Sequence, residues 1–81
     1  MRVTVRLFAR LREIVGANEL TRKIPIDSTV IVVWNDLARE FPDLMAYQNS
    51  ISTAVNTEYA RMDTALMEGD EVAFLPPVSG G

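Results

Sequence analysis

The sequence STVIVVWNDLAREF, residues 28–41, predicts one long amphipathic helix. Its apolar side chains recur at helical spacing, in the order Val30, Val33, Trp34, Leu37, Ala38 and Phe41. Residues at this spacing lie on one face of a helix. Taken alone, the β-branched run at 30–33 would favour a strand, but the apolar stripe continues well beyond it. Ser28 is the predicted N-cap, with Asp27 as the alternative, and Pro42 should end the helix.

Shorter elements are predicted on both sides of this helix. Alternation of apolar and polar residues, or β-branched and aromatic content, predicts strands at residues 2–8, 19–26, 52–56, 59–62 and 71–75. Short helical segments are predicted at residues 9–15 and 44–47. Pro25 places the second strand at an edge of the sheet or at the strand's end, because proline has no N–H to donate. Asn56 and Thr57 should form a hairpin tip, and Gly69 a turn.

The order of these elements predicts an α+β fold of the β-grasp type, with a mixed sheet of four to five strands packed on one long helix. In that arrangement the first and last strands lie side by side and run parallel. Residues 1–75 would form the domain, and residues 76–81 an extended C-terminal tail. A chain of 81 residues has room for a single core.

The composition argues against several classes of function. Eight basic and eleven acidic residues give a net charge of −3, which is unusual for a nucleic-acid-binding domain. Cysteine and histidine are absent, so disulfides and the Ser–His and Cys–His catalytic dyads are excluded, and we expect no metal site. No apolar run approaches the ~20 residues that span a bilayer. We therefore expect a cytoplasmic protein without membrane contact.

The segment FLPPVSGG, residues 74–81, carries the most information about function. Its two prolines stop the last strand and stiffen the chain beyond it. Because glycine has no Cβ, a tail with Gly80 and Gly81 fits a narrow channel in a partner and presents its carboxylate as the reactive group. The alternative is a frayed end without a role.

A docking surface is predicted beside this tail. If the first and last strands run parallel, Phe8 and Leu75 emerge close together on the face opposite the core. Large apolar side chains beside a protruding tail are typical of a surface that binds a partner. Arg12 is a candidate to bind a carboxylate or carbonyl of that partner. The alternative is a set of isolated exposed side chains of the ordinary kind.

Three segments resemble the MoaD-type sulfur carriers, the ubiquitin-like small subunits of molybdopterin synthase in the MoaD/ThiS family: LFARLREIVG at 7–16, AVN at 54–56 and EGDEVAFLPPVSGG at 68–81. The resemblance implies that an E1-like, MoeB-type enzyme uses ATP to adenylate the Gly81 carboxylate, which then becomes a thiocarboxylate. It also implies docking on a MoaE-type large subunit, in a heterotetramer of two small and two large subunits. There the sulfur passes to a pyranopterin to build the dithiolene of molybdopterin. The chain itself would be a non-catalytic carrier that binds no cofactor.

The same resemblance implies roles for individual residues. Gly81 would carry the sulfur, while Gly80, Ser79 and Val78 would enter the active site of the large subunit. The interface with that subunit would be formed by Phe8, Arg12, Tyr59, Leu75, Pro76 and Pro77. Leu75 stands where phenylalanine is common in the family, and Tyr59 where an aliphatic residue is often found.

Other functions are compatible with such a tail. A sulfur carrier of another pathway, of the thiamine type, shares the fold and the Gly-Gly end. A ubiquitin-like modifier would join Gly81 to lysines of target proteins, although the single Lys23 leaves little scope for chains on itself. A plain interaction module would have an inert tail.

Overall fold

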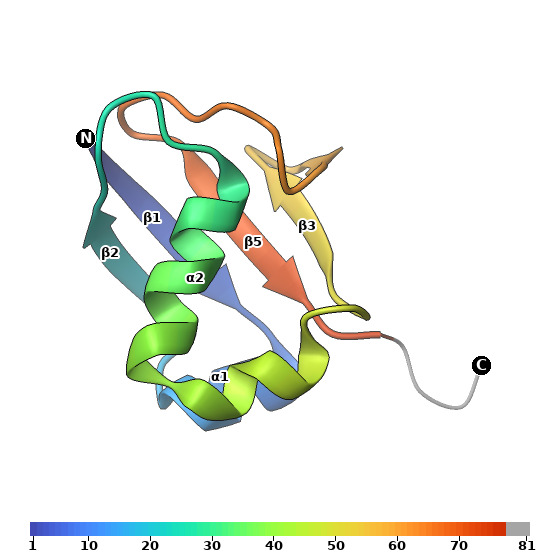
Figure 1. The fold of residues 1–81 in the computed structure, drawn as a ribbon. Helices are drawn as coiled ribbons and strands as arrows, with labels where there is room; N and C mark the ends of the chain where they lie inside the picture. Colours follow the sequence, from blue (N-terminus) through green and yellow to red (C-terminus); the bar gives the residue numbers. More distant parts are fainter. Residues whose placement is uncertain (78–81) are drawn as a thin grey trace.

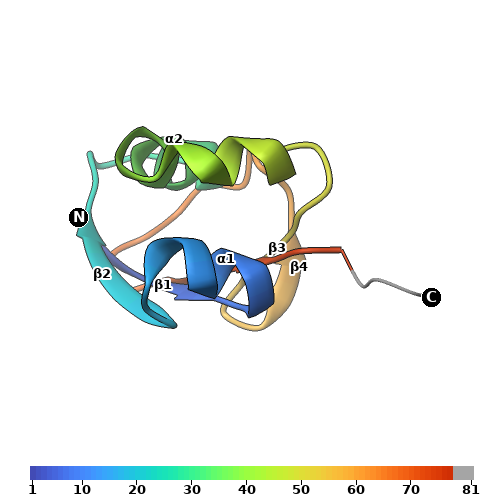
Figure 2. The same ribbon diagram turned by 90° about the horizontal axis from the view of Figure 1, so that it is seen from below.

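The computed structural model describes residues 1–77 and contains a five-stranded sheet in the order β2-β1-β5-β3-β4. The strands are β1 (Arg2–Leu7), β2 (Glu19–Lys23), β3 (Ser52–Val55), β4 (Glu58–Ala60) and β5 (Glu71–Leu75). The helices are α1 (Ala9–Val15), α2 (Val30–Glu40) and the 3-10 helix η1 (Pro42–Tyr47). β1 and β5 are parallel, and the other neighbouring strands are antiparallel. Figures 1 and 2 show α2 lying across one face of the sheet.

The core fills the space between α2 and the sheet. Most of its fully buried side chains come from alternate positions of the two central strands and from the apolar stripe of α2, and α1 and η1 add one leucine each: Val3, Val5, Leu7, Val72, Phe74, Val30, Val33, Trp34, Leu37, Leu11 and Leu44. The ring centroids of Trp34 and Phe74 are 5.1 Å apart with planes tilted by 56°, a favourable aromatic arrangement. The predicted α+β fold, with a mixed sheet packed on the long helix, is confirmed.

The start of α2 differs from the prediction that Ser28 is its N-cap. The helix begins at Val30, and the cap position is Thr29, which makes no capping hydrogen bond with its side chain. The Ser28 hydroxyl instead donates to the Pro25 carbonyl at 2.6 Å. The first amides of the helix, those of Val30 and Ile31, donate to carbonyls of the loop that follows β4, at 3.0 and 2.8 Å. That loop satisfies the free N–H groups, so a side-chain cap is not needed.

Four predicted strands are shorter than expected. β3 ends at Val55 because Asn56 belongs to the hairpin loop. β1 ends at Leu7 because Phe8 takes the N-cap position of α1. β2 ends at Lys23, since Pro25 cannot continue the ladder, and Ile26 lies beyond the strand and is 77% exposed. β4 covers Glu58–Ala60 because a turn starts immediately afterwards, in which the Arg61 amide donates to the Thr64 hydroxyl. The predicted edge position of β2 is confirmed.

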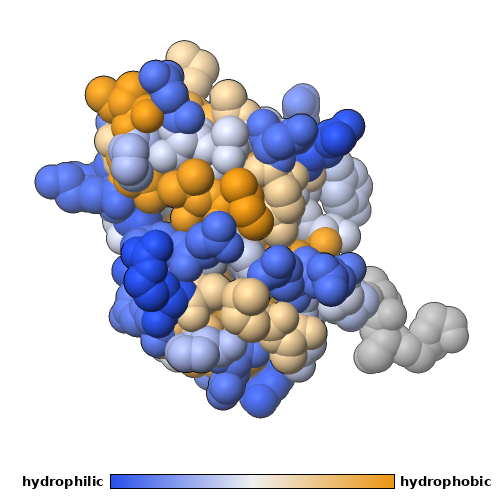
Figure 3. All heavy atoms as spheres, viewed as in Figure 1, coloured by the Kyte–Doolittle hydropathy of each residue, from blue (hydrophilic) through white to orange (hydrophobic). Residues whose placement is uncertain are grey.

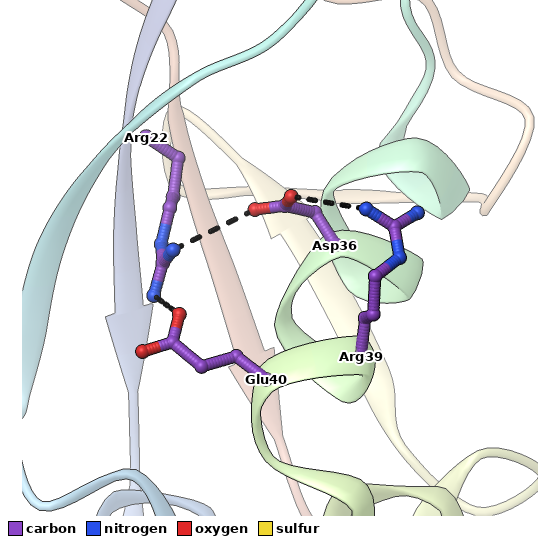
Figure 4. A network of polar contacts seen from close by, with 4 residues as sticks. All are labelled: Arg22, Asp36, Arg39 and Glu40. Carbon is purple, nitrogen blue, oxygen red and sulfur yellow. Dashed lines mark ion pairs between the residues drawn. The ribbon is translucent and has the colours of Figure 1, made fainter.

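An ion-pair network joins edge strand β2 to α2 (Figure 4). The Arg22 guanidinium lies 2.6 Å from a Glu40 carboxylate oxygen and 3.8 Å from one of Asp36. Arg39 approaches Asp36 from the helix at 3.9 Å. Arg22 interrupts the apolar pattern of its strand, and the network accounts for this, because the helix supplies its counter-charges. Networks of this kind contribute more than isolated surface pairs.

The two predicted turns are confirmed. Asn56 and Thr57 form a two-residue hairpin loop between β3 and β4, with φ of 51° and 72°. Gly69, before β5, has φ of 84°. The molecular surface on the α2 side mixes hydrophilic residues with smaller apolar areas (Figure 3). Across residues 1–77, every helix is too short or too polar to cross a membrane.

Candidate functional site

The central strands β1 and β5 end side by side, where the chain leaves the domain toward the tail (Figure 1). Their parallel register pairs Leu7 with Phe74, and both side chains are buried in the core. Phe8 continues in an extended conformation. Because successive residues of an extended chain point to opposite faces, Phe8 and Leu75 lie on the face away from α2. They line the same groove, which confirms that the two residues converge.

This groove follows a row of paired residues across the outer face of the sheet. The register pairs Arg6 with Ala73, Ala73 with Ala54, and Ala54 with Tyr59. The two alanines leave a depression between larger side chains. We call it the outer groove, and its lining residues are Arg6, Phe8, Ala54, Thr57, Glu71, Ala73 and Leu75. It continues into a hollow bounded by Tyr59, which shares Ala54, Thr57 and Leu75 with it.

The outer groove has the chemistry of a protein-docking surface. Its floor is made of small side chains, while Phe8 is 37% exposed and Tyr59 is 88% exposed at its sides. The guanidinium carbon of Arg6 lies 5.7 Å from the centroid of the Phe8 ring, within the range of a cation–π contact. Aromatic residues and arginine are the residues that contribute most to protein interfaces. The groove therefore provides groups for binding, and the absence of histidine and cysteine leaves it without the usual catalytic pairs.

The hairpin loop holds one end of the outer groove in place. The Asn56 side chain donates to an Asp70 carboxylate oxygen at 2.9 Å and accepts from the Glu71 amide at 2.9 Å. The backbone N–H of Asn56 donates to the Glu71 carbonyl at 2.8 Å. These contacts fix the loop against the start of β5. Thr57, the next residue in the loop, is thereby held at the groove.

The other predicted site residues lie at different distances from the outer groove. Arg12 is exposed on α1, and its amide donates to the Phe8 carbonyl at 3.4 Å, so it stands one helical turn beyond the groove without lining it. Pro76 and Pro77 continue directly from β5, the first partly buried and the second exposed. The remaining predicted residues, Val78, Ser79, Gly80 and Gly81, lie outside the described residues. Their roles stay predictions.

A second arginine of α1 has its own partner. The Arg10 guanidinium donates to a Glu13 carboxylate oxygen at 3.2 Å, and this hydrogen bond raises the pKa of Arg10 above its usual value. Both residues of this pair belong to α1, and neither lines the outer groove.

Several groove residues were not identified from the sequence, namely Arg6, Ala54, Thr57, Glu71 and Ala73. Alternation in the first strand places Arg6 on the outer face, but its neighbours across the sheet depend on the pairing order of the strands. The small size of Ala54 and Ala73 becomes informative only when they are opposite each other.

Known proteins are similar to this chain in sequence and fold. The ThiS family model matches residues 5–81. The molybdopterin synthase sulfur carrier subunit of Arabidopsis thaliana is 38% identical over 79 residues, which cover 98% of this chain and 82% of that protein. The human protein of the same name is 34% identical, covering 98% of this chain and 93% of its own length.

Among solved structures, the crystal structure of the small archaeal modifier protein SAMP1 from Haloferax volcanii superposes with a TM-score of 0.86. It is 30% identical, and the match covers 100% of both chains. The similarity in sequence and fold extends over nearly the whole length of this chain. The chain belongs to the ThiS family, whose members include ubiquitin-like sulfur carriers of the MoaD type.

Proposed function

We propose that this protein is the sulfur-carrier small subunit of a molybdopterin synthase and delivers sulfur as a thiocarboxylate on Gly81. The observation that carries the proposal is the position of the outer groove. Phe8 and Leu75 line it, and the chain passes from Leu75 directly into the proline pair that begins the tail. The near full-length similarity to molybdopterin synthase sulfur carrier subunits supports this assignment over a general binding role.

The chemistry uses the terminus and leaves catalysis to the partners. A carboxylate is a poor electrophile, so an E1-like, MoeB-type enzyme would transfer AMP from ATP to the Gly81 carboxylate and release pyrophosphate. A sulfur donor would then displace AMP and leave a thiocarboxylate. Its sulfur is a soft nucleophile that needs no base from this chain. Neither Cys nor His is required here, and the carrier contributes a positioned terminus.

Docking on a MoaE-type large subunit would position that terminus. Six residues follow Leu75, and a chain of that length spans at most about 20 Å when fully extended. The active site of the partner therefore has to lie within that distance of the surface that covers the outer groove. The resemblance adds that two small and two large subunits assemble. ATP serves the activating enzyme, and this chain would bind no cofactor of its own.

A second function is supported by one of the structural matches. SAMP1 is named as a modifier, and its fold superposes on this chain over its whole length. As a modifier, this chain would form an isopeptide bond between Gly81 and a lysine of a target protein. A thiamine-type carrier would make the same thiocarboxylate but deliver its sulfur to another acceptor. The products of the reaction therefore distinguish the three functions.

Intact-mass spectrometry tests the proposal. The protein is incubated with ATP, a sulfide source and an extract of its own organism, with a variant lacking Gly81 as the control. We expect one oxygen to be replaced by sulfur, mapped to Gly81, and we expect the product to convert a pterin precursor when the large subunit is added. A thiocarboxylate that transfers no sulfur to the pterin would favour a carrier of another pathway. Conjugates to target lysines in place of a thiocarboxylate would favour the modifier.

A further inference from the structure

Arg6 occupies a central place in the outer groove and has few partners of its own. It begins the row that continues through Ala73 and Ala54. Its Nε atom is buried and has no hydrogen-bond partner. The nearest acid, Glu71, is 4.0 Å away from Nη1, beyond hydrogen-bonding distance. The guanidinium therefore keeps donors that residues 1–77 do not satisfy.

The surroundings of Arg6 hold the guanidinium close to the sheet surface. The guanidinium carbon of Arg6 lies 5.7 Å from the centroid of the Phe8 ring. The Arg6 side chain is 41% exposed. A cation on an aromatic ring loses little conformational freedom when a partner arrives. The apolar residues that line the groove, Ala54, Ala73 and Leu75, offer no hydrogen-bond acceptor from their side chains.

Covering this groove with a purely apolar surface would be unfavourable. The exposed part of the Arg6 guanidinium would lose its water, and its donors would be left unpaired. Glu71 does not compensate, because a pair at 4.0 Å between two half-exposed side chains contributes little. A partner that brings a carboxylate over Arg6 can accept hydrogen bonds from the exposed part of the guanidinium, in a charge-assisted contact.

We propose that Arg6 is a specificity-determining residue, and that the surface which docks on the outer groove carries a carboxylate that pairs with its guanidinium. The inference rests on the proposed function, because it takes the large subunit of the synthase as the partner. It adds to that function the chemical character of the partner's surface. An acid opposite Arg6 would discriminate against large subunits that present an apolar or basic residue at this position.

Titration calorimetry of the full-length protein with the large subunit from the same organism tests this inference. Arg6→Met removes the charge and retains an apolar side chain of similar length, and Arg6→Lys retains the charge. Arg39→Gln is the matched control, because it removes one positive charge from the opposite side of the molecule, on α2. Urea unfolding of each variant checks that the domain remains folded. A series of NaCl concentrations measures the electrostatic part of the binding.

We expect Arg6→Met to weaken binding at least about tenfold and to flatten the salt dependence, because a buried charge on the partner loses its counter-charge. Arg6→Lys should recover part of the affinity, and Arg39→Gln should change it by less than about twofold. Equal affinity for the wild type and Arg6→Met would overturn the inference while the proposed function stood. An equal loss in Arg39→Gln would also overturn it, since general charge would then explain the effect. A wild-type protein that does not bind the large subunit would contradict both.

Discussion

Leu7 stands directly opposite Phe74 in the parallel ladder between β1 and β5, and both side chains are buried beneath α2. This single pairing fixes two features. On the inner face it closes the core, where Phe74 also contacts Trp34. On the outer face it brings Phe8 and Leu75 together at the origin of the tail. The stability of the domain and the shape of the outer groove therefore depend on the same register.

Substitutions at adjacent positions of β5 should separate these two features. Phe74→Ala removes a fully buried ring and should lower the free energy of unfolding by about 3–5 kcal/mol. Leu75→Ala removes a partly buried side chain on the outer face and should cost less stability, but weaken binding to the large subunit. Urea unfolding and titration calorimetry measure the two quantities. Phe8→Ala should behave like Leu75→Ala, and Ile26→Ala, at an exposed loop position, is the control. Unchanged affinity in both groove variants would refute the docking role.

Filling the outer groove should block docking without unfolding the domain. Ala54→Leu adds a branched side chain at the centre of the row between Ala73 and Tyr59. The fold should tolerate it, because the position is on the outer face. Thr21→Leu introduces the same side chain on edge strand β2, opposite Thr4 and away from the groove. We expect Ala54→Leu to weaken binding about tenfold or more and Thr21→Leu to leave it near the wild-type value. Similar affinities for the two variants would show that the groove is not covered by the partner.

The hairpin loop should become more stable when Thr57 is replaced by glycine. Thr57 is β-branched yet has φ of 72°, a conformation that costs energy for such a residue. Asn-Gly is the preferred pair for a two-residue loop of this geometry. Thr57→Gly should therefore raise the free energy of unfolding by about 0.5–2 kcal/mol. A loss of stability in urea would show that the threonine side chain contributes contacts that outweigh the backbone strain.

The same substitution also tests why a threonine stands at this position. Thr57 lines both the outer groove and its continuation toward Tyr59. Strained residues are often retained at functional sites. We expect Thr57→Gly to weaken binding to the large subunit even as it stabilises the domain. A Thr57→Gly variant that is more stable and binds the large subunit as tightly as the wild type would show that the strained threonine has no role in binding.

The sequence predicted the fold because its periodic patterns are strong in the helix and the central strands. The apolar stripe of α2 is compatible with few structures other than a helix, and the alternation in β1 with few other than a strand. The predicted cap at Ser28 was wrong, because carbonyls from a loop more than thirty residues later bind the first amides of α2. The outer groove was only half predicted for a related reason. The convergence of Phe8 and Leu75 follows from two neighbouring parallel strands, whereas the place of Ala54 in the groove depends on the order of the remaining strands.

Deletion of Gly81 should abolish sulfur transfer and leave the fold intact. Among the described residues, the buried hydrophobic core extends from Val3 to Phe74, so we expect the free energy of unfolding to change by less than about 0.5 kcal/mol. The reactive carboxylate would move one residue back, out of reach of the activating enzyme's adenylation site and of the large subunit's active site. A misplacement of this size is enough to suppress a reaction that depends on positioning. Intact mass after incubation with ATP and sulfide, followed by a pterin sulfuration assay, measures both steps.

Gly81→Ala is the matched variant for this deletion, because it preserves the length of the tail and its carboxylate but adds a Cβ. If the partner channels are as narrow as the Gly-Gly end implies, this variant should also lose most of its sulfur transfer, while its unfolding remains that of the wild type. Normal sulfur transfer by Gly81→Ala, together with no transfer by the deletion variant, would mean that the partners require the full length of the tail but tolerate a side chain on its last residue. Normal pterin sulfuration by the deletion variant would remove Gly81 from the mechanism and leave the outer groove as the part of the molecule whose function has to be explained.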